Sequence, residues 1–173
     1  MANNELSVEN TPDGKAITWT DEGGRTFRAA FALENGQPVI QSIATQEGEQ
    51  WTPLAEGLCP EFEITTGVRR GLVNQPEEER WWNYSDRPLT HPEEVRTAQA
   101  AYACPRIESR IDGARAEITF PGVTIGQFAG AVRFTVYRGA NLLRVELVAR
   151  TEEDSVAYMY RAGLSGLAAT EFL

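Results

Sequence analysis

The chain has 173 residues, of which 42% are hydrophobic, and a formal net charge of −9 at pH 7. This length is enough for one domain with a buried core, and no apolar run approaches the ~18–20 residues of a membrane span. The acidic balance argues against nucleic acid and anionic membranes as partners, because like charges repel. We therefore expect a soluble protein. Without a signal peptide at its start it is expected to be cytoplasmic, or exported if a leader was removed.

Short runs of alternating apolar and polar residues fill most of the chain, with turn sequences such as DEGG and ENGQP between them. Successive side chains of a strand point to opposite faces, so this period of two predicts strands. Their spacing is typical of an antiparallel β-sandwich, and we expect one sandwich domain over residues 1–173. Nine strands are predicted, at residues 16–20, 26–33, 39–45, 61–66, 106–112, 116–120, 131–138, 142–150 and 155–162.

The clearest predicted hairpin joins the runs AVRFTVYR and LLRVELVAR through the turn GAN. Alternation places one set of apolar side chains on a common face and the polar ones on the other. The apolar set consists of Val132, Phe134, Val136, Leu143, Val145, Leu147 and Ala149.

At most one short helix is expected, at residues 91–101 (HPEEVRTAQAA). Proline near its start and two glutamates in its first turn suit the positive end of a helix. Residues 96–103 fit a strand equally well, and both interpretations stay open.

The C-terminal sequence AGLSGLAATEFL directly follows the last predicted strand, which risks leaving an edge free to pair. Three explanations are open. The C-terminal segment packs back on this edge, or another protomer covers the edge, or the chain is the N-terminal part of a longer protein. We favour the last two together, which makes a homodimer or a neighbouring domain a candidate partner.

Residues 120–164, FPGVTIGQFAGAVRFTVYRGANLLRVELVARTEEDSVAYMYRAGL, resemble the N-terminal part of bacterial proteins with a galactose-mutarotase-like β-supersandwich. The preceding segment, HPEEVRTAQAAYACPRIESRIDGARAEITFPGV, is similar to the same polysaccharide-related group. That fold is shared by sugar epimerases, polysaccharide lyases and sandwich domains of glycosidases. The resemblance implies a carbohydrate context and part of a supersandwich, and it transfers no catalytic residue.

One aromatic stretch, RWWNYSDRPLTHP, falls in a long segment with no secondary-structure period. The flat rings of Trp81, Trp82 and Tyr84 suit stacking on sugar rings, and Arg87 suits hydrogen bonds to hydroxyls. Alternatively, the tryptophans cap the open end of the sandwich as core, or form a subunit contact. A further hypothesis is proton abstraction from a uronate by Tyr84 and the sole histidine, His91, with Arg87 neutralising the carboxylate.

The cysteines, Cys59 and Cys104, are either two free buried thiols or a disulfide between strands. With one histidine they cannot supply the four ligands of a structural zinc site, and we expect neither metal nor cofactor.

The leading hypothesis is a non-catalytic, carbohydrate-associated module that binds sugar or packs on a partner through residues 80–91. The alternatives are a lyase-like or epimerase-like enzyme, and a structural dimerisation or inter-domain module.

Overall fold

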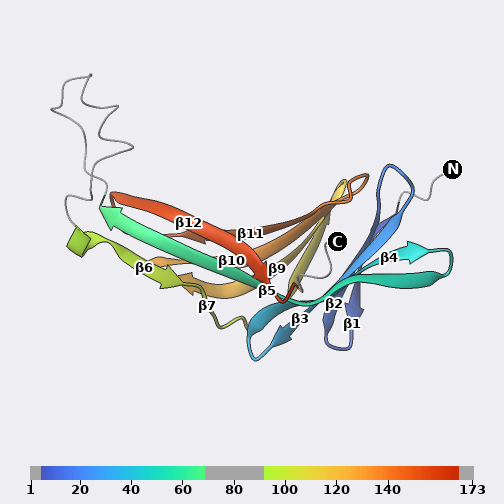
Figure 1. The fold of residues 1–173 in the computed structure, drawn as a ribbon, viewed down its shortest axis with the longest axis horizontal. Coiled ribbons are helices and arrows are strands. Elements are labelled where there is room, and N and C mark those ends of the chain that lie inside the picture. Colours follow the sequence, from blue (N-terminus) through green and yellow to red (C-terminus); the bar gives the residue numbers. More distant parts are fainter. Residues whose placement is uncertain (1–4, 69–91, 168–173) are drawn as a thin grey trace, which may run out of the picture.

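A computed structural model describes residues 5–68 and 92–167. Those residues form two antiparallel sheets packed as a sandwich, with a single turn of 3-10 helix at Pro92–Glu94 and no α-helix in the described part (Figure 1). Seven strands make the first sheet, in the order β1-β2-β3-β4-β5-β12 with β6 also on β5. They are β1 (Leu6–Thr11), β2 (Gly14–Thr20), β3 (Thr26–Glu34), β4 (Gln37–Glu47), β5 (Gln50–Val68), β6 (Arg96–Gln99) and β12 (Val156–Ser165).

The second sheet has five strands, in the order β11-β10-β9-β7 with β8 also paired to β9. They are β7 (Ala101–Tyr102), β8 (Glu108–Asp112), β9 (Arg115–Ile125), β10 (Phe128–Tyr137) and β11 (Leu143–Arg150). Figure 1 shows β9, β10 and β11 behind the long strands β5 and β12, so the second sheet faces one half of the first.

Strand β5 connects the two halves of the first sheet because it changes partner along its length. Up to Leu58 it pairs with β4, and from Cys59 onward it pairs with β12. Gly57, just before this change, has a φ of 66°, a left-handed conformation that suits glycine. One strand of 19 residues therefore runs from the N-terminal meander to the region where β12 packs.

The core lies between the sheets and comes from the side chains that alternation turns inward. Phe31 of the first sheet meets Phe134 of the second with ring centroids 4.9 Å apart. The indole Nε1 of buried Trp19 donates a hydrogen bond to the carbonyl oxygen of Ala140 at 2.8 Å. Burying each such ring contributes roughly 1.5–3 kcal/mol, so these contacts help to hold the two sheets together.

The all-β prediction is confirmed, and each of the nine predicted runs overlaps a strand. The hairpin is also confirmed: Val132, Phe134 and Val136 are fully buried on β10, which pairs with β11. For residues 96–103 the strand interpretation is correct, since β6 and β7 occupy most of this segment. Ala98 and Ala100 pack against the core there, which favours an extended chain over a helix.

Strand β1 and the first half of β5 were not predicted, and β6 and β7 were left open between helix and strand. Strand β1 is short and largely polar, while β6 and β7 have too few residues to show a period. The first half of β5 contains Pro53 and Gly57, residues that disfavour strands. Pro53 is accommodated because it pairs with Ala44 beside a register shift in β4, one of the few sheet positions that tolerate proline.

Candidate functional site: an open groove between two sheet edges

The predicted site residues Trp81, Trp82, Tyr84, Arg87 and His91 all lie outside the described residues. Their roles in sugar stacking, core capping, subunit contact or proton transfer therefore stay predictions. The described residues contain a different candidate site, which lies between the two sheets.

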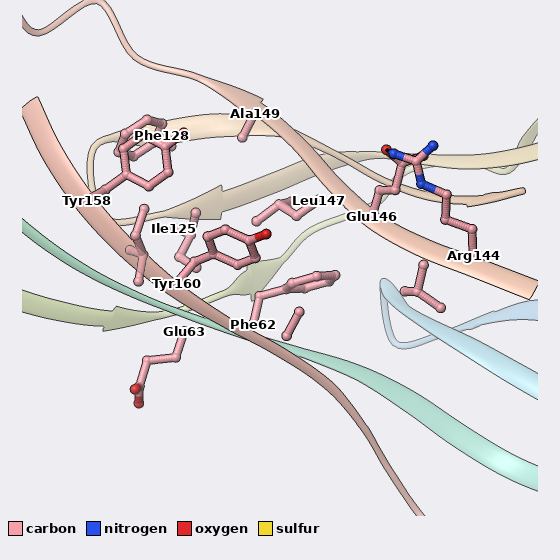
Figure 2. Close-up of a pocket in the computed structure, with 13 residues that line it drawn as sticks. Phe62, Glu63, Ile125, Phe128, Arg144, Glu146, Leu147, Ala149, Tyr158 and Tyr160 are labelled. Atoms are coloured by element: carbon pink, nitrogen blue, oxygen red, sulfur yellow. Dashed lines mark hydrogen bonds and ion pairs between the residues drawn. The ribbon is translucent and has the colours of Figure 1, made fainter.

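This site is a groove of about 420 Å³ between β12 and β5 on one side and β9, β10 and β11 on the other (Figure 2). It exists because β12 extends the first sheet over the second without close packing between their inner faces. Its apolar lining side chains are Phe62, Ile64, Ile125, Phe128, Val145, Leu147, Ala149 and Ala162.

Two tyrosines of β12 point into the groove and remain largely exposed. Tyr158 is 62% exposed and Tyr160 is 69% exposed, although both sit on the inward face of a sheet strand. Phe128 meets Tyr158 edge-on at a centroid distance of 5.7 Å and closes one end of the groove. Tyr160 lies further along, above Phe62 and opposite Leu147 (Figure 2).

The charged residues beside the groove point away from its interior (Figure 2). Glu63 lies on the outer face of β5, where its carboxylate accepts a hydrogen bond from Gln99 at 2.6 Å and pairs with Arg161 at 3.6 Å. Arg144 and Glu146 pair at 2.6 Å on the outer face of β11. A hydrogen bond with Tyr137 and the charge of Glu146 raise the pKa of Arg144 above its usual value.

Both strands beside the groove have one free edge in the described part of the chain. There β11 pairs with β10 alone, and β12 pairs with β5 alone. Each free edge exposes backbone N–H and C=O groups that can pair with another strand. Met159, on the outer face of β12, is 70% exposed, so β12 is uncovered on both faces as well as along its edge.

The two cysteines are free thiols. Cys104 is buried in the core and Cys59 is partly buried, and burial raises the pKa of both thiols. A raised pKa reduces the thiolate fraction at neutral pH, so neither is poised as a nucleophile. The described residues also contain no group of three or more His, Cys, Asp or Glu able to hold a metal ion.

Comparison of the chain with protein-family models, curated proteins and solved structures found no match. The resemblance to galactose-mutarotase-like proteins therefore stays a prediction. No helix in the described ranges is long and apolar enough to cross a membrane.

One feature of the sequence indicates the groove, although the general alternation of apolar and polar residues makes it easy to miss. In YMYR, three large residues in succession, Tyr158, Met159 and Tyr160, break the alternation of apolar and polar positions. Large apolar or aromatic residues in succession on an exposed strand indicate an interaction surface. In the structure the side chains on both faces of β12 are exposed here.

Proposed function

We propose that this protein is a non-catalytic β-sandwich module that packs against a polypeptide partner through the groove between β11 and β12. The observation that supports it is the exposure of Tyr158 and Tyr160, which line the groove on a strand with a free edge in the described part of the chain. Contiguous apolar surface of this kind marks interaction sites in soluble proteins.

Strand addition is the mode of binding that fits these features. An added strand would pair with a free sheet edge through its backbone, while its alternate side chains would enter the groove. The groove offers Phe62, Leu147 and the two tyrosines to those side chains. Each large apolar side chain buried there would contribute roughly 1.5–3 kcal/mol.

The lining of the groove fits binding better than catalysis. Among the described side chains that point inward, the polar groups are the hydroxyls of Tyr158 and Tyr160. General acid–base catalysis needs a positioned proton donor and acceptor, and the described lining has no carboxylate or imidazole that points into the groove.

The test uses fluorescence polarisation of labelled extended peptides with dilute protein. One peptide alternates valine and threonine, and a second has the same composition with the alternation scrambled. We expect saturable binding of the alternating peptide alone, weakened at least about tenfold by Leu147→Asn, which makes the groove floor polar. Met159→Gln is the matched control, because Met159 is exposed outside the groove. Equal binding of both peptides, or no effect of Leu147→Asn, would overturn the proposal.

A carbohydrate-binding module is the second candidate. It is favoured by the two exposed rings of Tyr158 and Tyr160, which lie two residues apart on one face of β12. Such rings present flat apolar faces of the kind that stack on pyranose rings. Calorimetric titration with neutral and uronate-containing oligosaccharides tests this candidate. Saturable heats lost in Tyr160→Ala would support it, and heats absent from the unmodified protein would rule it out.

A further inference from the structure

The free edge of β11 has a charge pattern that is complementary to itself. Its outward side chains, including the residue two beyond the strand, are Arg144, Glu146, Val148, Arg150 and Glu152. Glu146 and Arg150 lie two residues on either side of Val148, and their charges are opposite. Arg144 and Glu152 lie four residues on either side of it, and their charges are opposite too. All except Glu146 are well exposed, with side-chain exposures of 58% for Arg144, 86% for Arg150 and 88% for Glu152.

We infer that the partner is a second copy of this chain, with β11 pairing antiparallel to β11 about a two-fold axis at Val148; this rests on the proposed function. In that register Arg144 faces Glu152 of the second copy, and Glu146 faces its Arg150. Symmetry doubles these two contacts to four pairs of opposite charge. Opposite charges directly across an antiparallel ladder stabilise it, whereas like charges destabilise it.

Neighbouring registers lack this match. An axis one residue earlier places Arg144 opposite Arg150, and an axis one residue later places Glu146 opposite Glu152. An axis at Glu146 or Arg150 places that residue opposite itself. The charge pattern therefore selects Val148, which is 43% exposed and would pack against its own copy.

The same register suits the inward face of β11. There Leu147 lies opposite Ala149 of the second copy, a large residue against a small one. A two-fold axis perpendicular to the sheet keeps inward residues inward, so the second sheet continues across the contact. Since β12 borders the same opening, the contact covers the mouth of the groove together with the edge of β11.

A second copy fits this site better than a single added strand. The groove has two free edges beside it, β11 and β12, and an isolated strand can pair with one of them. A second copy brings an edge and its own exposed Tyr158 and Tyr160 to the opening at once. Symmetric contacts of this kind are the commonest way in which soluble proteins associate.

Sedimentation equilibrium tests this inference with two charge reversals, Glu146→Arg and Arg150→Glu. We expect the unmodified protein to reach twice the chain mass of 19.2 kDa at high concentration. Each reversal turns both of its symmetric pairs into repulsions, so each variant alone should dimerise at least about tenfold more weakly. An equimolar mixture of the two variants restores opposite charges at all these positions and should recover the dimer.

The matched control is Arg110→Glu, which makes the same charge change at an exposed residue of β8 paired with Asp112. It should dimerise like the unmodified protein, and circular dichroism should show all variants folded. The inference would be overturned if the unmodified protein stayed a monomer at about 100 µM. It would also be overturned if the two charge-reversal variants and their mixture dimerised like the Arg110→Glu control. A monomer that still binds the alternating peptide leaves the proposed function standing, whereas one that binds no peptide overturns both.

Discussion

The ring of Phe128 meets the ring of Tyr158 edge-on, with centroids 5.7 Å apart and planes at 68°. Phe128 begins β10 of the second sheet, and Tyr158 lies on β12 at the edge of the first. This ring pair joins the two sheets at one end of the groove. Beyond it, toward Tyr160, the inner faces of the sheets are separated, and the groove is the result.

A double-mutant cycle on Phe128→Ala and Tyr158→Ala should give a coupling free energy of about 0.5–1.5 kcal/mol, the value of an edge-to-face ring pair beyond its buried area. Urea denaturation of the four proteins measures it. The matched control pairs Phe128→Ala with Tyr160→Ala, because Tyr160 lies further along the groove, above Phe62 (Figure 2). Equal coupling in both cycles would contradict the account.

Gly130 allows β10 and β11 to approach closely. A Cβ at this position would overlap the carbonyl oxygen of Val148 and crowd the backbone of Ala149. Gly130→Ala should therefore push β11 away and destabilise the fold by about 1–3 kcal/mol. Chemical denaturation measures the loss, and Gly163→Ala, where an added Cβ meets nothing within 4 Å, is the control. A neutral Gly130→Ala variant would show that β11 is not held at this distance.

Asp21 should make the fold sensitive to acid. Its carboxylate accepts hydrogen bonds from the backbone N–H of Arg25 at 2.9 Å and from the Nε of Arg25 at 3.0 Å. These contacts lower the pKa of Asp21 below its ordinary value of 3.8. The stabilisation is therefore complete above that value and is lost as the pH falls through the lower folded-state pKa.

Thermal melts of the protein and of Asp21→Asn test this expectation. The unmodified protein should melt higher at pH 7, and the difference in Tm should shrink as the pH falls below 3.8 and through the lower folded-state pKa of Asp21. A difference that is constant over this range would assign the effect to packing rather than to charge.

Tyr102 should make the fold sensitive to alkali. Its hydroxyl donates a hydrogen bond to the carbonyl oxygen of Pro60 at 2.6 Å, and burial raises its pKa from 10.0 to about 12. A raised folded-state pKa favours the neutral phenol, so the stabilisation is present below pH 10 and is lost as the pH rises toward 12. The Tm of the unmodified protein should fall more steeply across that interval than the Tm of Tyr102→Phe. Parallel curves would contradict the assignment.

Much of the fold could be predicted from local pattern alone. A strand with one buried face must alternate, and the alternation of Val132, Phe134 and Val136 gave both the strand and its inward face. The partner change of β5 has no such local signal. It depends on Ile40 pairing with Leu58 and on Ser165 pairing with Cys59, contacts far apart in the chain.

The candidate site was harder to predict than the strands around it. Tyr158 and Tyr160 fall in a predicted strand, but their exposure depends on how far β11 and β12 lie from one another. That distance is set by tertiary packing, which no single strand encodes. The aromatic cluster at Trp81 and Trp82 is more conspicuous in the sequence, yet it lies outside the described residues.

Backbone amide hydrogen exchange across a range of protein concentrations tests the central claim most directly, that the edges of β11 and β12 are an interaction surface. At low concentration the backbone amides on the free edge of β11 should exchange quickly, because in the described part of the chain that edge has no partner strand. At high concentration they should become protected, while amides of β1, at the far edge of the first sheet, should exchange at an unchanged rate. Rates in β11 and β12 that are independent of concentration, with no added protection from the alternating peptide, would contradict the claim.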